Sequence, residues 1–150
     1  MGIALSPDER RLAVVLDHIT DIQKEICRLE AGYLRKVAEL SKVGGSARSV
    51  TNELALVLRW DRHHAGKEVA HAKALTRLLP RTLAALEEGT IDRYRADQVV
   101  WGTAVLDDDT TRRADEMLAT RLEKTPNNLA RPIRAPEPLH EPRPPEEPPF

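Results

Sequence analysis

The feature that most constrains this chain is a set of large apolar residues that recurs every seven positions through its first forty residues. The leading row consists of Leu12, Ile19, Ile26, Tyr33 and Leu40. A second row, three positions later, holds Val15, Ile22 and Leu29, and after an interruption at Lys36 it passes to Val37. Rows with this spacing lie on one side of an α-helix. The pattern predicts a helix of roughly four heptads with an apolar stripe that something has to cover.

Both ends of this helix carry recognisable signals. Ser6-Pro7-Asp8-Glu9 is typical of a capped helix start, and Gly44-Gly45 is typical of a helix end. Two ways of covering the stripe remain open. It can pack on the rest of the same chain, or it can form a coiled coil with a second copy. The second alternative predicts a homodimer through Leu12, Ile19, Ile26, Tyr33 and Leu40.

The remainder of the chain also favours helices. Apolar spacing, caps and breakers predict further helices at residues 50–59, 62–78, 82–88, 92–105 and 107–123, and no segment alternates with a period of two. Nine of the eleven prolines lie in residues 126–150, which predicts a disordered tail. We therefore expect an all-α domain at residues 1–125, with a helix-turn-helix-like pair after the long helix, and a proline-rich tail at 126–150.

Composition excludes several classes of site. The single cysteine, Cys27, rules out an internal disulfide and a multi-cysteine zinc site, and its place on an apolar stripe predicts a buried thiol. No signal peptide or membrane-crossing run is evident, so we expect a cytoplasmic protein with no membrane contact. Asp107, Asp108 and Asp109 are consecutive and point in different directions around a helix, which argues against a metal site. With no phosphate loop or marked nucleophile, we expect no enzyme, catalytic residue, cofactor or metal.

Residues 50–78 have the proportions of a helix-turn-helix unit within a basic part of the chain. Residues 42–81 hold eight basic against three acidic side chains, a net of +5, whereas residues 87–123 hold five against ten, a net of −5. Basic groups on the outer side of the second helix can bind duplex DNA. The candidate DNA-binding residues are Arg48, Arg59, Arg62, His63, His64, Lys67 and His71. The alternative is an ordinary α-hairpin with a solvated basic face.

One stretch resembles a known family. It is the run Leu79-Pro80-Arg81-Thr82-Leu83-Ala84-Ala85-Leu86-Glu87-Glu88-Gly89, preceded by Ala70-His71-Ala72-Lys73-Ala74-Leu75. The Ala96-Asp97-Gln98-Val99 segment and Leu106-Asp107-Asp108 continue the pattern. In these residues the chain resembles the 13E12-repeat family over roughly residues 10–129.

The resemblance implies an actinobacterial protein whose relatives often occur in several copies, some on mobile elements. Full-length members usually add a C-terminal HNH endonuclease domain, whose histidines and asparagine bind a divalent metal. No position here matches that motif, so no catalytic residue is carried over. We expect a DNA-binding or accessory module of such a protein, truncated before its nuclease domain. The alternatives are a dimerisation or protein-interaction module and a non-functional truncated remnant.

Overall fold

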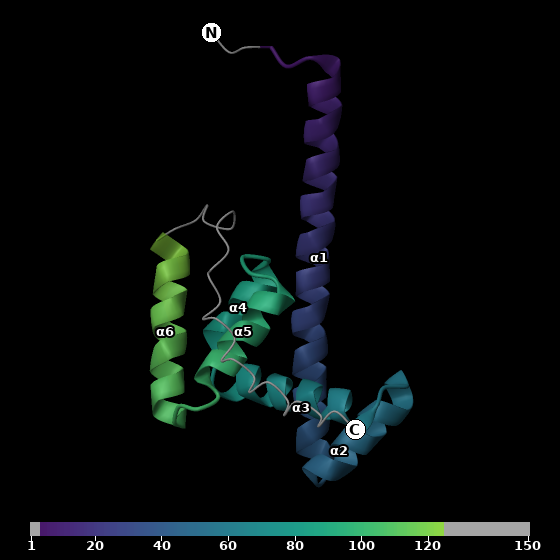
Figure 1. The fold of residues 1–150 in the computed structure, drawn as a ribbon, viewed down its shortest axis with the longest axis vertical. Coiled ribbons are helices and arrows are strands. Elements are labelled where there is room, and N and C mark those ends of the chain that lie inside the picture. Colours follow the sequence, from purple (N-terminus) through teal and green to yellow (C-terminus); the bar gives the residue numbers. More distant parts are fainter. Residues whose placement is uncertain (1–3, 125–150) are drawn as a thin grey trace, which may run out of the picture.

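The computed structural model describes the backbone of residues 4–124 and the side chains of residues 4–121, and this part of the chain is all-α (Figure 1). Its six helices are α1 (Pro7–Val43), α2 (Ala47–Leu58), α3 (Arg62–Arg77), α4 (Pro80–Glu88), α5 (Arg93–Thr103) and α6 (Asp108–Lys124). The all-α prediction is confirmed. The predicted tail at residues 126–150 lies outside the described residues. None of these helices combines the length and hydrophobicity needed to cross a bilayer.

Helix α1 begins at the predicted capping box. The Glu9 backbone N–H donates to Ser6 Oγ at 3.2 Å, and the Ser6 N–H donates to Glu9 Oε2 at 2.7 Å. Each side-chain oxygen thus accepts from a backbone N–H that the first turn of a helix leaves without a partner. The helix ends at Gly44, whose N–H reaches the Leu40 carbonyl at 2.8 Å.

Only the second half of α1 belongs to the core. Its buried residues begin at Cys27 and continue through Ala31, Leu34, Val37 and Ala38, whereas the first half projects away from the other helices (Figure 1). Cys27, Leu34 and Ala38 each lie one position after a member of the predicted heptad rows, because the core contacts mainly the neighbouring side of the helix, whereas Val37 belongs to a row itself. The predicted rows therefore meet the chain's own core only at their C-terminal end. Tyr33 and Leu40 are half-buried against the core, while the rows from Leu12 to Leu29 stay exposed.

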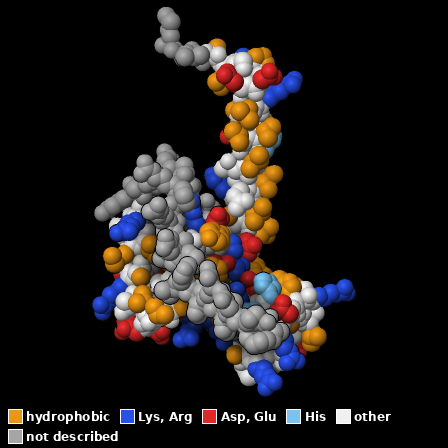
Figure 2. All heavy atoms as spheres, viewed as in Figure 1, with side chains coloured by type: hydrophobic (Ala, Val, Ile, Leu, Met, Phe, Trp, Pro, Cys, Tyr) orange, Lys and Arg blue, Asp and Glu red, His pale blue; other side chains and the backbone are white. Residues whose placement is uncertain are grey.

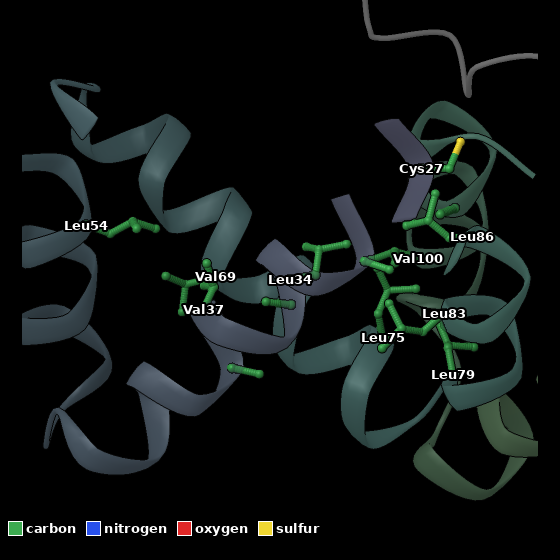
Figure 3. Close-up of a cluster of buried hydrophobic side chains, with 14 of the residues drawn as sticks. Cys27, Leu34, Val37, Leu54, Val69, Leu75, Leu79, Leu83, Leu86 and Val100 are labelled. Carbon is green, nitrogen blue, oxygen red and sulfur yellow. The ribbon is translucent and has the colours of Figure 1, made fainter. Parts of the chain in front are cut away.

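The core is built mainly from α1, α3 and α4 (Figure 3). Leu34, Leu75, Leu79 and Leu86 are each fully buried at its centre. Alanines at 31, 65 and 72 have no exposed surface, and such small side chains let helices approach closely. The thiol of Cys27 is buried, as predicted, and burial raises its pKa.

Helix α4 obtains its N-cap from a distant residue. Leu79, which precedes it, makes no side-chain cap, but the Asp115 carboxylate on α6 accepts from the Arg81 N–H at 3.0 Å and the Thr82 N–H at 2.9 Å. The Thr82 hydroxyl donates to the same carboxylate at 2.6 Å. Asp115 is 2% exposed, so this contact anchors α6 to α4 in the interior. Helix α6 lies on the side of α4 and α5 away from α1 (Figure 1).

Candidate functional site

The predicted basic surface lies on α2, the connection after it and the start of α3. Helix α2 starts three residues earlier than predicted, because Ser46 rather than Ser49 provides its cap, accepting from the Ser49 N–H at 3.1 Å. Arg48 is therefore inside the first turn of α2. Figure 2 shows lysine and arginine side chains gathered over this end of the molecule.

Six of the seven predicted DNA-binding residues are exposed: Arg48, Arg59, Arg62, His63, His64 and Lys67. Arg48, Arg59 and Arg62 make no side-chain hydrogen bond or ion pair within the described residues. Two of the other exposed groups contact tryptophan rings. His64 stacks edge-on against Trp60 with ring centroids 4.4 Å apart, and Lys67 Nζ lies 5.7 Å from the centre of the Trp101 ring.

Arg59 has an unusual backbone. It ends α2 with φ 55° and ψ 41°, the left-handed conformation that glycine usually supplies. The Trp60 N–H then bonds to the Ala55 carbonyl at 3.0 Å and closes the helix end. Asp61 caps α3 by accepting from the His64 N–H at 2.9 Å, a bond that lowers the pKa of Asp61. This turn presents Arg59 and Arg62 on either side of a compact connection.

His71 is not part of the exposed surface, and its predicted role is wrong. It is 6% exposed, and its Nδ1 lies 2.8 Å from Asp97 Oδ1 on α5. Its ring also packs edge-on against Trp101, with centroids 5.7 Å apart. Sequence spacing placed it on the outer side of α3, but α5 packs against that side. A helix that entered a DNA groove with its Glu68–His71 side would have to lose these contacts.

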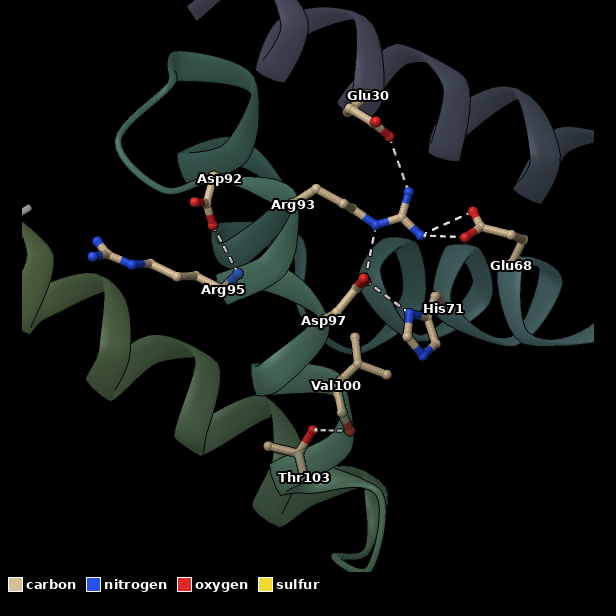
Figure 4. A network of polar contacts seen from close by, with 9 residues as sticks. All are labelled: Glu30, Glu68, His71, Asp92, Arg93, Arg95, Asp97, Val100 and Thr103. Carbon is tan, nitrogen blue, oxygen red and sulfur yellow. Dashed lines mark hydrogen bonds and ion pairs between the residues drawn. The ribbon is translucent and has the colours of Figure 1, made fainter. Parts of the chain in front are cut away.

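Arg93 forms the centre of the polar network that covers this side of α3 (Figure 4). Its Nε lies 2.8 Å from Asp97, its Nη1 lies 3.0 Å from Glu30 on α1, and its Nη2 lies 2.9 Å from both oxygens of Glu68 on α3. Burial alone would lower the pKa of Arg93, but the hydrogen bonds to Asp97 and Glu68 outweigh it and raise that pKa. One guanidinium thus joins three helices.

A groove of about 520 Å³ opens beside this network. Its apolar wall is Ile26, Leu29, Tyr33 and Trp60, and its polar wall is Glu30, His64, Glu68, Arg93 and Asp97. The Tyr33 hydroxyl is buried and has no hydrogen-bond partner in the described part of the chain. Burial, followed by the negative charge of Glu68, raises the pKa of Tyr33. The groove therefore combines an apolar wall with an excess of carboxylates.

Sequence reasoning missed Glu30, Arg93 and Asp97. A signal was present, because Arg93 and Asp97 are four apart on the side of α5 that also holds the buried Ala96 and Val100. Charged residues at helical spacing beside buried ones indicate an internal ion pair. Within the described residues, no group of three or more histidine, cysteine, aspartate and glutamate side chains is arranged to hold a metal ion.

Of the residues predicted for a homodimer, Leu12, Ile19 and Ile26 are exposed by 61, 56 and 45%. Tyr33 and Leu40 are half-buried against the chain's own core, so the exposed part of the predicted dimer row ends at Ile26. No protein-family model, curated protein or solved structure matches this chain.

Proposed function

We propose that this chain is an accessory module that binds the phosphate backbone of duplex DNA. The observation that carries the proposal is the set of three exposed arginines, Arg48, Arg59 and Arg62, that have no carboxylate partner within the described residues. Arginine without an internal partner is available to pair with phosphate, whose oxygens it can contact through two parallel N–H groups.

The proposed contact is with phosphates rather than with base edges. The Glu68 and His71 side of α3 packs against α5, so this side of α3 cannot enter a groove of the duplex. Phosphate contacts carry no direct sequence information. We therefore expect similar affinity for duplexes of unrelated sequence and a strong dependence on salt.

Fluorescence anisotropy with short labelled duplexes tests the proposal. Three phosphate contacts should give a slope of about −3 in a plot of log association constant against log salt concentration. Arg48→Ala, Arg59→Ala and Arg62→Ala should each reduce that slope by about 1.

The matched control is Arg112→Ala on α6, an exposed arginine whose described contact is a 3.5 Å pair with Asp109. Its binding should equal that of the unaltered chain. The proposal is wrong if the unaltered protein fails to bind at low salt, or if Arg112→Ala weakens binding as much as the three test variants do.

A further inference from the structure

The first six turns or so of α1 carry an apolar face that nothing in the described part of the chain covers. Its members are between 45 and 61% exposed: Leu12, Val15, Leu16, Ile19, Ile22, Ile26 and Leu29. Figure 2 shows hydrophobic side chains along the projecting part of α1. We call this set the arm stripe. Soluble monomers rarely expose contiguous apolar patches larger than a few hundred Å².

We propose that a second copy of this chain covers the arm stripe, with the two α1 helices antiparallel and Leu12 of each copy opposite Leu29 of the other. In this register the layers are Leu12 with Leu29, Val15 with Ile26, and Ile19 with Ile22, so every row residue meets an aliphatic partner. At roughly 100 Å² per side chain, the six row residues from both copies would remove about 1,200 Å² from water. That area falls within the range of stable protein–protein interfaces.

The antiparallel direction follows from where the core begins. With Leu12 opposite Leu29, the first helical residue, Pro7, is level with Leu34, which is fully buried. The part of α1 that projects from one core is therefore as long as the exposed part of the partner helix that it has to cover. A parallel pair would instead bring both cores to the same end of the arm. It would also place Glu25 next to Glu30 of the other helix, at the flanking positions where opposite charges favour pairing.

The groove supplies a complementary charge at the end of the arm stripe. Three carboxylates, Glu30, Glu68 and Asp97, face one guanidinium there, and the Glu30 side chain is 35% exposed. The antiparallel register brings the N-terminal turns of the second copy, which hold Arg11, to the mouth of this groove. Arg11 is exposed and makes no ion pair within the described residues. The apolar wall formed by Ile26, Leu29 and Tyr33 continues the arm stripe into the same groove.

Cysteine cross-linking in the full chain tests the direction of pairing. Leu12→Cys protein is mixed with a size-tagged Leu29→Cys protein under mild oxidation, and the native Cys27 stays unreactive because it is 2% exposed. The 12–29 cross-link should exceed the 12–12 and 29–29 products by at least about tenfold, since only facing positions meet disulfide geometry. Predominant 12–12 and 29–29 products would overturn the antiparallel arrangement.

Sedimentation equilibrium tests the interface itself. Ile22→Asp should weaken association by at least about 100-fold, because each interface would then bury two unpaired carboxylates. Val14→Asp is the matched control, since Val14 is 52% exposed on the same helix but lies outside the arm stripe. Its association should remain within a few-fold of the unaltered chain. A monomer at about 100 μM, or equal weakening by both variants, would overturn the proposal. This inference is independent of DNA binding.

Discussion

Arg93 and Glu68 are joined by one guanidinium nitrogen, Nη2, which lies 2.9 Å from each oxygen of the carboxylate. The two side chains are 17 and 14% exposed, so this pair is largely shielded from water. It holds α5 against the side of α3 that sequence spacing assigned to DNA. The polar network around this pair therefore determines which side of α3 a ligand can reach.

Removing the guanidinium should strongly destabilise the fold. Arg93→Ala leaves Glu30, Glu68 and Asp97 close together without their cation, and the expected loss is about 3 kcal/mol of unfolding free energy. Arg93→Lys should recover only part of it, because an ammonium cannot reproduce the planar set of donors. Urea unfolding followed by circular dichroism measures both. Arg28→Ala, which removes an exposed pair with Glu25, should leave the midpoint unchanged.

The stability of the fold should depend on pH through Asp97. Burial alone would raise the pKa of Asp97, but hydrogen bonds from His71 and Arg93 hold it below its ordinary value of 3.8. A pKa that is lower in the folded state contributes stability above the ordinary value and loses it as pH falls through the folded value. Asp97→Asn should therefore be less stable than the unaltered chain at pH 7. The difference in unfolding free energy between the two proteins should narrow below a pH of about 4, as measured by urea unfolding across that range. A difference that stays constant with pH would contradict this assignment.

The cap from α6 to α4 should dominate the attachment of α6. Asp115→Ala removes three hydrogen bonds to one carboxylate and should cost about 2 kcal/mol. Hydrogen exchange should then accelerate in α6 and in the first turn of α4. Exchange in α2 should be unaffected, since α2 has no contact with this carboxylate. Uniform acceleration throughout the chain would show that the loss is global rather than local.

Two glycines should respond to alanine in opposite directions. Gly89 ends α4 with φ 75°, and an added Cβ would lie 2.8 Å from Lys24 Cγ and 3.3 Å from Lys24 Cα. Gly89→Ala should therefore lose about 2 kcal/mol. At Gly102 in α5 an added Cβ meets nothing within 4 Å. Gly102→Ala should gain about 0.5–1 kcal/mol from helix propensity. Thermal unfolding of the two variants provides the comparison.

A substitution at Arg59 can separate the effect of the side-chain charge on DNA binding from the effect of the backbone conformation on stability. Arg59→Gly relieves a left-handed residue that carries a side chain and should raise the unfolding free energy by up to about 1 kcal/mol. The same change removes one exposed cation, so affinity for duplex DNA should fall. A variant that is more stable yet binds DNA less well would link the loss to the side chain and not to unfolding. Unchanged DNA affinity would remove Arg59 from the proposed interface.

Local signals explain why the helices themselves were predictable. The Ser6–Glu9 capping box, the Asp92 cap of α5 and the glycine after α4 each act within a few residues, so the sequence alone locates them. The predicted end of α3 is one residue beyond the observed Arg77. These elements follow from rules that need no tertiary structure.

The candidate site was less predictable because it depends on which helix sides meet. Arg48, Arg59 and Arg62 were placed correctly on the exterior, since no helix packs over them. The burial of His71 depends on α5, which follows it by more than twenty residues. The cap from Asp115 to Thr82 spans 33 residues and leaves no local pattern. In α1 the core contacts the side next to the heptad rows, which periodicity alone could not decide.

The position of Cys27 as the first buried residue of α1 has a consequence for the helix before it. Residues 7–26 contribute no buried residue to the core, and a single helical segment of this length is only marginally stable in water. The helical turns of this segment therefore depend on continuity with the anchored half of α1 and on a partner surface that excludes water from the apolar side. The far-ultraviolet ellipticity per residue should rise with protein concentration, while the unfolding of the α3–α4 region should not shift.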